Sequence, residues 1–516
     1  MKVVTAEQMQ QMDAEAIQKF GISGLDLMER AGEGCAAAII EACQNADNCS
    51  AMIMCGKGNN GGDGYVVARL LRARGWDVTV VILARPEDIA GDASVNLKRL
   101  PADISIHFCA DEESLGRCLS ESSGFSVIVD ALLGTGLKQE VAGLYLQAIK
   151  LMNNAGCPVI AVDIPSGISG SSGKVLGNAV RADLTVTFAS AKLGHILYPG
   201  AGHVGRLKIV EIGVPSEIVE KAAGAEFVDA SVAARLIKQR DPSAHKGSFG
   251  HILIIAGSTG HTGAAALAAS GAVRSGAGLV SLAIPASLNQ ILEQKTTEAM
   301  TLPLPDCDRG YLASDALDPI RSALQGRDVM ALGPGISRQR ETSDLVRQLV
   351  REVKLPLVID ADGLNALSED TSLFTESISP SIVLTPHPGE MARLCGVTVA
   401  EVEADRVGVA RDFAVNHGVF LVLKGARTVI AAPDGAVAIN GSGNPGMASG
   451  GMGDVLTGII AALLGQDYPP FDACRLGVFV HGLAADLSAA EKGMIGLIAS
   501  DVVERLPYAF KKLLEL

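Results

Sequence analysis

Short apolar runs alternate with longer segments of mixed polarity along most of this chain. In the first half the apolar runs lie at residues 51–55, 78–83, 127–129, 159–162 and 184–188, and helix-length segments separate them. Strands that are apolar at successive positions are typical of a parallel sheet that helices cover on both faces. The pattern therefore predicts an α/β fold in which a sheet lies between two helical layers.

A second series of apolar runs begins after about residue 225. These runs lie at residues 252–255, 279–284, 329–332, 357–359, 382–384 and 420–423. Because 516 residues exceed one ordinary core, two α/β domains are the default expectation, and the length also allows three. The polar segment 216–240 between the two series has a helical pattern, and we place the domains at residues 1–220 and 226–516.

The first residues carry clear helix signals. Thr5 and Gln8 have the spacing of a capping box, and Gly21 is a typical residue just beyond a helix end. A second helix is expected from about residue 25 into the alanine-rich segment 36–42.

The composition of the chain indicates which partners and which compartment to expect. A net charge of -14 argues against general affinity for nucleic acid or anionic lipid, so neither nucleic acid nor membrane is an expected partner. The N-terminus lacks the apolar core of a signal peptide, and the ten cysteines are scattered without a C-x-x-C pair. A cytoplasmic protein with reduced, buried cysteines is expected.

The most informative motif is the glycine-rich stretch G-S-G-N-P-G-M-A-S-G-G-M-G-D-V-L-T-G at residues 441–458. An apolar run follows it and predicts a helix, so the glycines lie where a helix begins and where backbone N–H groups favour an anion. Asp454 lies inside this turn. A carboxylate beside an anion site predicts proton transfer as well as binding.

Polar residues also follow several predicted strands of the second half. They include Lys424 and Arg427, the pair Asp360 and Asp362, and His387 between two prolines. Because the carboxyl ends of parallel strands meet at one edge of a sheet, these residues are expected to converge there. Asp360 and Asp362 are interpreted as loop-capping carboxylates, and His387 either as a ligand contact or as a turn residue.

From Ser243 onward the chain resembles the ribokinase-like fold. The motifs K-G-A-R-T, T-P-H-P-G-E, D-A-D-G-L-N and N-P-G-M-A-S-G-G-M-G-D are similar to those of the ADP/ATP-dependent NAD(P)H-hydrate dehydratases. The resemblance implies that Asp454 takes the ring-hydroxyl proton of a hydrated cofactor while a nucleotide phosphate is attacked, with Mg²⁺ accompanying ADP or ATP. It implies a nucleotide site at Lys424, Gly425, Ala426, Arg427, Thr428 and Gly453, and a hydrate site at Ala265, Gly335, His387 and Asp454.

In the first half, the motif N-N-G-G-D-G at residues 59–64 follows a strand and precedes a predicted helix at 65–74. It is not the dinucleotide fingerprint G-x-G-x-x-G, but it places N–H donors and a carboxylate at a helix start. Asp130, Asp163 and Ser166 follow later strands. Oxygen atoms that converge in this way suit a monovalent cation.

These motifs, with L-M-E-R-A-G before them, resemble the NAD(P)H-hydrate epimerase family over about residues 1–215. The resemblance implies a Rossmann-like three-layer sandwich that interconverts the R and S hydrates NADHX and NADPHX. It implies K⁺ held by Asn60, Asp130 and Ser166. The implied substrate contacts are Asn59, Asn60, Gly61, Gly62, Asp63, Gly134, Thr135, Gly136, Leu137, Lys138, Gln139, Glu140, Tyr145 and Asp163.

Asp163 is the candidate acid/base group of the first half. Lys192 is a candidate catalytic residue that either pairs with substrate phosphates or tunes this acid, and its alternative interpretation is a solvated surface lysine. Together the two resemblances identify the chain as a member of the fused NAD(P)H-hydrate repair enzymes. The family implies a homo-oligomer.

Two other functions fit parts of the sequence. One is a ribokinase-like kinase for a vitamin precursor joined to an unrelated Rossmann-like domain, which would release a stable phosphorylated product. The other makes the first half a non-catalytic nucleotide sensor or partner-binding module, which would bind ligand without exchanging epimers.

Overall fold

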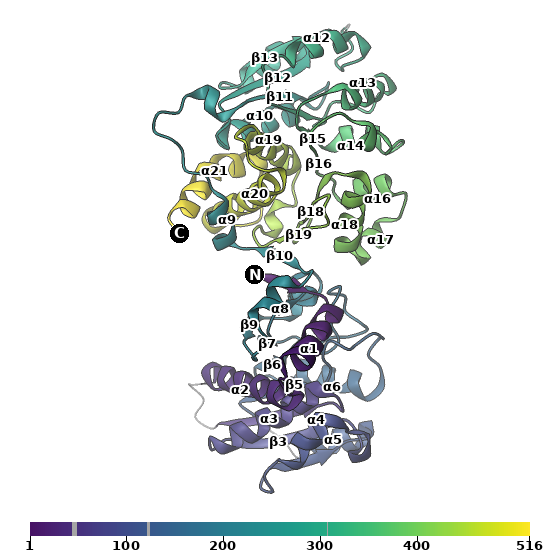
Figure 1. Ribbon diagram of the computed structural model, residues 1–516, viewed down its shortest axis with the longest axis vertical. Coiled ribbons are helices and arrows are strands. Elements are labelled where there is room, and N and C mark those ends of the chain that lie inside the picture. Colours follow the sequence, from purple (N-terminus) through teal and green to yellow (C-terminus); the bar gives the residue numbers. More distant parts are fainter. Residues whose placement is uncertain (44–48, 121–123, 307) are drawn as a thin grey trace. The chain divides into compact units, whose positions relative to one another are not determined.

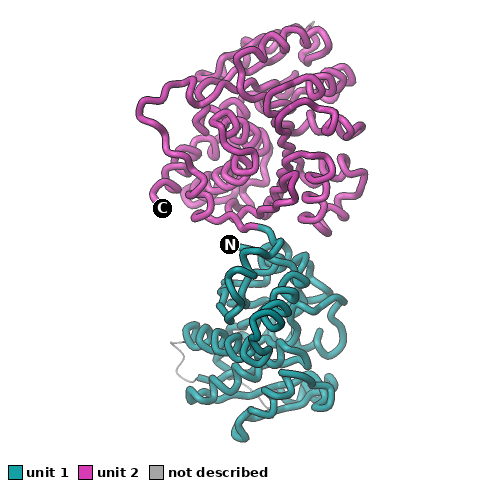
Figure 2. Tube along the Cα trace, in the orientation of Figure 1, with its two compact units in different colours: residues 1–225 teal, residues 226–516 magenta. Residues whose placement is uncertain are grey.

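The computed structural model describes residues 1–43, 49–120, 124–306 and 308–516. The chain forms two compact units, Met1–Ala225 and Glu226–Leu516 (Figure 2). The boundary between them in the sequence lies inside the segment 216–240. Each unit contains a mainly parallel sheet with helices on both faces (Figure 1), so the expected two-domain α/β class is confirmed.

The first unit begins with the two predicted helices. The Thr5 hydroxyl accepts a hydrogen bond from the Gln8 N–H at 3.1 Å, and the Gln8 side chain accepts one from the Thr5 N–H at 2.8 Å. This capping box opens α1 (Ala6–Phe20), and Gly21 closes it with φ 67°. Helix α2 (Gly24–Ala42) follows.

The sheet of the first unit is parallel, with the strand order β4-β3-β2-β5-β6-β7-β9. Its strands are β2 (Ser50–Cys55), β3 (Asp77–Ile82), β4 (Ser105–Phe108), β5 (Val127–Ala131), β6 (Val159–Val162), β7 (Leu184–Phe188) and β9 (Arg206–Val210). The short strands β1 (Lys2–Val4) and β8 (Ala191–Lys192) are parallel neighbours of each other and not part of this seven-stranded sheet. The sequence pattern missed β4 and β9, because these edge strands are partly exposed and not continuously apolar.

Strand β2 shows how the three layers arise. Ala51, Ile53 and Cys55 pack into a core with α2 and α3 (Asn59–Ala73). Met52 and Met54 point to the opposite core, which contains residues of α5 (Glu112–Ser120) and α6 (Gly143–Asn153). Since successive strand side chains alternate between faces, a fully apolar strand serves both cores.

Helix α3 begins earlier than expected. The motif N-N-G-G-D-G forms its first turns instead of a preceding loop, so the predicted start at residue 65 is wrong. A Cβ at Gly61 would lie 2.0 Å from the Gly56 carbonyl oxygen, and one at Gly64 would lie 2.7 Å from the Ala131 Cβ. The glycines therefore let the helix start pack directly against the ends of β2 and β5.

The sheet of the second unit has the order β13-β12-β11-β14-β15-β16-β17-β18-β19-β10. All its pairs are parallel except β17–β18 and β18–β19. Its strands are β10 (Ala225–Val228), β11 (His251–Ile255), β12 (Leu279–Pro285), β13 (Met300–Leu304), β14 (Val329–Leu332), β15 (Leu357–Ile359), β16 (Ile382–Leu384), β17 (Phe420–Leu423), β18 (Val429–Ala431) and β19 (Val437–Asn440). The segment 216–240 is not one helix, because β10 separates α8 (Ser216–Lys221) from α9 (Ala230–Leu236).

Helices cover this sheet in two groups (Figure 1). One group contains α10 (Thr262–Arg274), α19 (Met452–Gly465), α20 (Pro470–Lys492) and α21 (Ala499–Leu514). The other contains α13 (Arg340–Glu352), α14 (Ala361–Leu367), α16 (Pro388–Cys395) and α18 (Arg406–His417). The apolar run after the glycine-rich stretch is buried in α19, as predicted.

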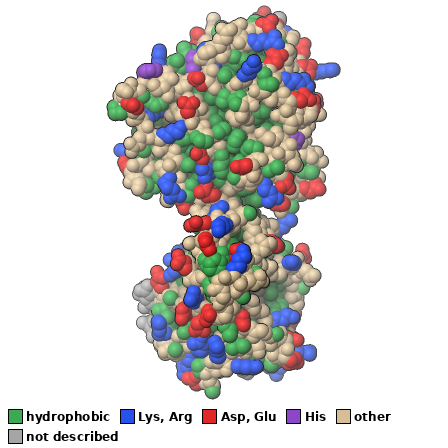
Figure 3. Space-filling view, in the orientation of Figure 1, with side chains coloured by type: hydrophobic (Ala, Val, Ile, Leu, Met, Phe, Trp, Pro, Cys, Tyr) green, Lys and Arg blue, Asp and Glu red, His purple; other side chains and the backbone are tan. Residues whose placement is uncertain are grey.

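The described surface is mixed in charge on the face drawn in Figure 3, where acidic and basic side chains are interspersed over each unit. Within the described part of the chain, no helix combines the length and the apolarity needed to cross a bilayer.

Close packing of α10 on α19 yields a stability prediction. A Cβ at Gly458 would lie 2.0 Å from the Ala268 carbonyl oxygen and 2.8 Å from the Ala272 nitrogen. We expect Gly458→Ala to lower the free energy of unfolding by about 1–3 kcal/mol, because the two helices must separate. Urea denaturation of the purified chain measures this change.

The matched control is Gly263→Ala, also in α10, where an added Cβ meets nothing within 4 Å. This variant is expected to be neutral or slightly stabilising, since alanine favours a helix more than glycine does. Equal stability of the two variants would contradict the packing argument.

Candidate active sites

A buried ion pair organises the site of the second unit. Asp360 follows β15 and Lys424 follows β17, and the Lys424 Nζ lies 2.6 Å from the Asp360 Oδ1. Glu390, at the start of α16, lies 3.9 Å from the same ammonium. The side chain of Asp360 is only 1% exposed. Glu390 follows β16, so the predicted convergence of polar residues at the carboxyl edge of the sheet occurs for β15, β16 and β17.

Asp360 is more than the loop cap that the sequence suggested. Burial opposes its ionisation, but the charge and hydrogen bond of Lys424 and the hydroxyl of Thr457 hold its pKa below the usual value. Thr457, in α19, donates to the Asp360 Oδ2 at 2.9 Å. Asp360 thus joins Lys424 to the helix that follows the glycine-rich turn.

Asp454 lies in the first turn of this same helix. Gly451, with φ 89°, precedes the helix. Its carbonyl accepts the first backbone hydrogen bond of α19, which the Val455 N–H donates. The earlier N–H groups of the turn are therefore available to an anion. Burial, with the negative charge of Asp360, raises the pKa of Asp454 to about 7. That value suits a group that accepts a proton near neutral pH.

The residues predicted to bind nucleotide form the turn from β17 to β18 and the start of α19. A Cβ at Gly453 would lie 3.1 Å from the Lys424 Nζ, so these two residues adjoin. The Arg427 guanidinium donates to the Gly441 carbonyl at 2.8 Å, and the Thr428 hydroxyl donates to the Gly425 carbonyl at 3.0 Å. Ala426 is exposed at the tip of the turn.

One supporting residue of this turn escaped the sequence analysis. Arg406, in α18, is buried and donates to the Leu423 and Lys424 carbonyls, each at 3.1 Å. Gly425 has φ 147°, and a Cβ there would lie 2.8 Å from the Arg406 guanidinium nitrogens. No local motif marks Arg406, since its role arises from contact with a distant turn.

The predicted hydrate-site residues lie in different surroundings. The Gly335 carbonyl accepts a hydrogen bond from the Ser258 hydroxyl at 2.8 Å, whereas Ala265 is fully buried in α10. The His387 Nδ1 accepts the Gly389 N–H at 3.0 Å and thereby caps α16. His387 therefore has a structural role beside any contact with a ligand.

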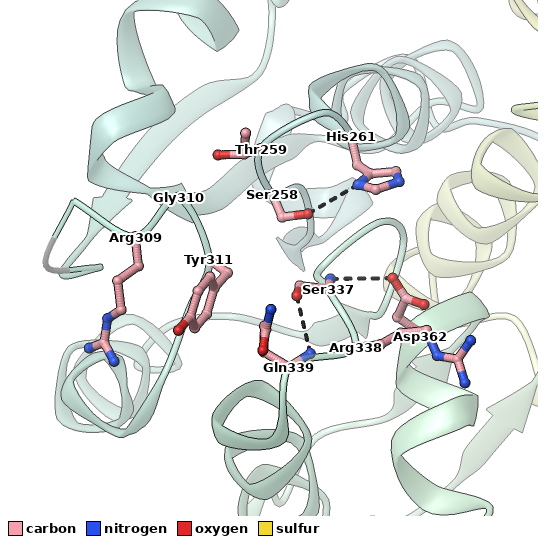
Figure 4. A pocket seen from close by; sticks show the side chains of 10 residues that line it. All are labelled: Ser258, Thr259, His261, Arg309, Gly310, Tyr311, Ser337, Arg338, Gln339 and Asp362. Atoms are coloured by element: carbon pink, nitrogen blue, oxygen red, sulfur yellow. Dashed lines mark hydrogen bonds between the residues drawn. The ribbon is translucent and has the colours of Figure 1, made fainter.

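A cavity of about 460 Å³ is lined in part by Ser258, whose hydroxyl binds the Gly335 carbonyl (Figure 4). Segments that follow β11, β13, β14 and β15 line it, so it lies at the carboxyl edge of the sheet. Its lining residues are Ser258, Thr259, His261, Arg309, Gly310, Tyr311, Ser337, Arg338, Gln339 and Asp362. The sequence analysis missed the contribution of residues 309–311, which belong to no recognised motif.

A second buried ion pair organises the site of the first unit. The Lys192 Nζ donates to the Asp163 Oδ1 at 2.5 Å, to the Thr187 hydroxyl at 2.8 Å and to the Phe188 carbonyl at 3.3 Å. Lys192 is 1% exposed and is not a solvated surface lysine. Since its three protons are already bonded, these contacts favour the tuning of Asp163 over binding of substrate phosphates.

Two carboxyl groups near Lys192 have pKa values that are shifted in opposite directions. Burial disfavours the charge on Asp163, but Lys192 outweighs it and holds this pKa below the usual value. Burial and the charges of Asp163 and Asp13 raise the pKa of Asp63 well above its usual value. Asp63 is 9% exposed, and its carboxyl group forms no hydrogen bond within the described part of the chain. Asp63 therefore holds its proton more readily than Asp163 does.

Asp13 is a further member of this group that the sequence analysis missed. It lies in the middle of α1, and burial raises its pKa to about 6. Its Oδ1 is buried without a hydrogen-bond partner. A lone aspartate within an amphipathic helix carries no motif, so only the tertiary contact reveals it.

The residues predicted to hold K⁺ are brought together around the end of β5. The Ser166 hydroxyl donates to the Asp130 Oδ1 at 2.6 Å and accepts the Leu133 N–H at 2.9 Å. A Cβ at Gly134 would lie 3.6 Å from the Asn60 Oδ1. Among the described residues, no group of three or more His, Cys, Asp or Glu side chains has an arrangement suited to a metal ion.

Apart from Asp163, which follows β6, the predicted substrate contacts of the first unit lie on three segments. Asn59, Asn60, Gly61, Gly62 and Asp63 form the first turns of α3. The loop of residues 134–140 follows β5 and is largely exposed at residues 136 and 138–140. Tyr145, in α6, donates its hydroxyl to the Leu83 carbonyl at 3.2 Å.

Comparison with known proteins assigns both units. Residues 24–194 match the family model described as YjeF-related protein N-terminus, and residues 252–508 match the model described as NAD(P)H-hydrate dehydratase. The bifunctional NAD(P)H-hydrate repair enzyme Nnr of Moorella thermoacetica is 45% identical over 520 residues, covering 100% of this chain and 98% of its own. The enzyme of the same name from Escherichia coli strain K12 is 37% identical, covering 97% and 92%.

The chain belongs to the bifunctional NAD(P)H-hydrate repair enzymes.

Solved structures support the ribokinase-like assignment of the second unit. The ADP/ATP-dependent NAD(P)H-hydrate dehydratase of Bacillus subtilis, co-crystallised with ATP and Mg²⁺, has a TM-score of 0.50 at 30% identity and covers 56% of this chain and 99% of its own. A ribokinase-like superfamily protein from Enterococcus faecalis has a TM-score of 0.50 at 25% identity, covering 57% and 97%. Membership of this family, with isomerase and lyase activities, is confirmed, and it displaces the kinase and sensor alternatives.

The Lys424–Asp360 pair yields a prediction for the repair enzyme. We expect Lys424→Met to lower the free energy of unfolding by about 3–5 kcal/mol, because it leaves the buried Asp360 carboxylate without its cation. Adding Asp360→Asn removes that charge and should recover most of the loss. Urea unfolding of the two single variants and the double variant measures the coupling, and strictly additive losses would contradict it.

Proposed function

We propose that the chain repairs hydrated nicotinamide cofactors at two sites. Residues 226–516 dehydrate the S epimers of NADHX and NADPHX with ADP or ATP, yielding the reduced cofactor, phosphate and AMP or ADP. Residues 1–220 interconvert the R and S epimers. The observation that carries this proposal is Asp454, a carboxyl group with a pKa near 7 in the first turn of α19, beside the Lys424–Asp360 pair.

The nucleotide site is assigned to Lys424, Gly425, Ala426, Arg427, Thr428 and Gly453. Available N–H groups at the start of α19 and the ammonium of Lys424 suit the phosphates. Mg²⁺, present with ATP in the Bacillus subtilis crystals, would be held by these phosphates near Glu390 and Asp360. It would supply charge neutralisation on the transferred phosphoryl group.

Dehydration follows from this arrangement. Ionised Asp454 accepts the proton of the ring hydroxyl. The hydroxyl oxygen then bonds to the terminal phosphorus of the nucleotide, and the phosphorus–oxygen bond to the remaining nucleotide breaks. Phosphate then leaves the ring carbon, and the adjacent carbon loses a proton to water as the ring double bond re-forms. The N–H groups near Gly451 and Gly453 stabilise the charge on the phosphoryl group.

The hydrated ring is assigned to Ala265, Gly335, His387 and Asp454. The cavity lined in part by Ser258 is assigned to the rest of the dinucleotide, since about 460 Å³ lies within the usual range of ligand pockets. Its loops offer hydroxyl, amide and guanidinium donors, which suit ribose and phosphate oxygens.

Epimerisation is assigned to the carboxyl pair of the first unit. Ionised Asp163 accepts the ring-hydroxyl proton as the adjacent carbon–nitrogen bond opens to a carbonyl, and protonated Asp63 gives its proton to the nitrogen. Attack of that nitrogen on the other face of the carbonyl closes the ring, and the two protons return. Lys192 keeps Asp163 ionised between turnovers.

The K⁺ site is assigned to Asn60, Asp130 and Ser166. The donor set fits K⁺, because carboxylate, hydroxyl and amide oxygens of these three residues lie around the end of β5. The ion would lie next to the substrate loop after β5 and would supply charge to order it.

The expected cytoplasmic location is supported by nine described cysteines, all of them free thiols. The homo-oligomer stays a prediction.

Dehydration is expected to depend on ionised Asp454. Since the base must be unprotonated, kcat/KM for dehydration should rise with pH through about 7 and then level off. Asp454→Asn should lower kcat by about 10²–10⁴-fold, while ADP binding measured by calorimetry persists. Recovery of absorbance at the wavelength of reduced nicotinamide, with S-NADHX and ADP, reports the rate.

The matched control is Asp467→Asn, beyond the other end of α19, which should leave the rate and its pH profile unchanged. Loss of ADP binding as the main defect of Asp454→Asn would make Asp454 structural. A stable phosphorylated product in place of reduced cofactor would favour a kinase.

Epimer exchange is expected to depend on Asp163. Asp163→Asn keeps the shape of the side chain and tolerates its φ of 64°, so we expect exchange to fall by about 10²–10⁴-fold with dehydration of the S epimer unchanged. Chromatography of R and S hydrates without nucleotide measures exchange. Asp88→Asn, on the surface of the same unit, is the control. A fall in both activities would indicate misfolding instead of loss of an acid/base group.

A further inference from the structure

We propose that His195 is a positioning residue of the epimerisation site, which holds the main chains of Asp163 and Lys192 in the geometry that proton transfer requires. This inference rests on the proposed function of the first unit.

His195 bonds to both members of the ion pair through their backbones. It belongs to the short helix α7 (Leu193–Ile196) that follows Lys192. Its Nδ1 lies 3.0 Å from the Lys192 nitrogen, and its Nε2 lies 2.9 Å from the Asp163 carbonyl oxygen. The imidazole therefore bridges two residues that are 29 positions apart in the chain.

These two contacts define the protonation of the ring. A backbone N–H only donates, so Nδ1 must accept from Lys192, and a carbonyl only accepts, so Nε2 must carry the proton. Burial and the neighbouring Lys192 charge lower the pKa of His195 to about 3. The ring is thus neutral and in one tautomer near neutral pH.

Asp163 needs such support because its backbone is in an unusual conformation. Its φ of 64° lies in the left-handed region, where non-glycine residues persist only when neighbouring contacts hold them. The Asp163 N–H donates to the Val186 carbonyl at 2.8 Å, and His195 binds its carbonyl. Both sides of this strained residue are therefore fixed by hydrogen bonds.

The side chain of Asp163 is held just as closely. Its Oδ1 accepts hydrogen bonds from Lys192 and from the Thr187 hydroxyl, the latter at 3.0 Å. Within the described part of the chain, Oδ2 has no such partner and is the oxygen left for the ring hydroxyl. Rotation of the Asp163 backbone would move Oδ2 away from that hydroxyl.

His195 itself does not reach the substrate. It is 4% exposed, and both of its ring nitrogens are bonded to main-chain atoms. Its effect must pass through Asp163 and Lys192. Loss of the bridge should therefore lower kcat while leaving KM nearly unchanged.

Two substitutions separate the two hydrogen bonds. In His195→Asn, the amide oxygen takes the place of Nδ1 and keeps the bond to Lys192, but the side chain is too short to reach Asp163. In His195→Gln, the amide nitrogen takes the place of Nε2 and keeps the bond to the Asp163 carbonyl. We expect kcat for epimer exchange to fall about 10- to 100-fold in His195→Asn and less than about 3-fold in His195→Gln.

The control for a general loss of packing is Thr185→Val. Thr185 is also buried, in β7, and its hydroxyl donates to the Val204 carbonyl at 2.8 Å, so this variant removes a side-chain hydrogen bond to a carbonyl other than that of Asp163. We expect wild-type kcat for exchange in Thr185→Val. Dehydration of the S epimer by the same chains should be unchanged in every variant and reports an intact second unit.

The outcomes are distinct. Wild-type kcat in His195→Asn, equal losses in the Asn and Gln variants, or a similar loss in Thr185→Val would overturn the inference. If His195→Asn does not fold, His195→Gln tests the inference alone. Loss of exchange in a folded His195→Gln variant contradicts the positioning role, and near wild-type exchange supports it. Absence of exchange in the wild-type chain would instead refute the proposed function.

Discussion

Each unit depends on a lysine ammonium buried against an aspartate at the carboxyl edge of a parallel sheet. Lys424 meets Asp360 at 2.6 Å in the second unit, and Lys192 meets Asp163 at 2.5 Å in the first. Desolvation of either charge alone would be strongly unfavourable, so each partner requires the other. The pairs bind separate strand ends together and leave a polar, organised edge on an otherwise apolar sheet.

The ion pairs also determine the state of the carboxyl groups beside them. Asp454 and Asp63 lie near an aspartate that a lysine keeps ionised, and burial together with that negative charge raises their pKa values. A site with one ionised and one readily protonated carboxyl can both accept and donate protons. The two units reach this condition with unrelated motifs, which suits two reactions on the same ring hydroxyl.

Glycine makes these sites possible by permitting close approach of backbones. Side chains at Gly61 and Gly64 would collide with the ends of β2 and β5, and one at Gly458 would collide with α10. The starts of α3 and α19 therefore reach the sheet edge where the charged pairs lie. Helix N-termini at that edge add N–H groups that favour anionic substrates.

The sequence by itself determined the class of fold, the central strands and the principal motifs. Continuous apolar runs mark β2 and β11 because these strands are buried on both faces, and the Thr5 capping box marks α1 through purely local bonds. The motifs around Asp454 and Asp163 were recognisable because glycine and acidic residues recur there at short, uncommon spacings.

Only the tertiary structure decided which groups act together. Edge strands such as β4 escaped detection because exposure breaks their apolar pattern. Asp13 and Arg406 lie in no motif, since the groups they affect are distant in sequence. His195 gains its role only by reaching the Asp163 carbonyl, 32 positions earlier in the chain. Protonation, too, depends on burial and on neighbouring charge, which folding creates by bringing separate strand ends to one edge of a sheet.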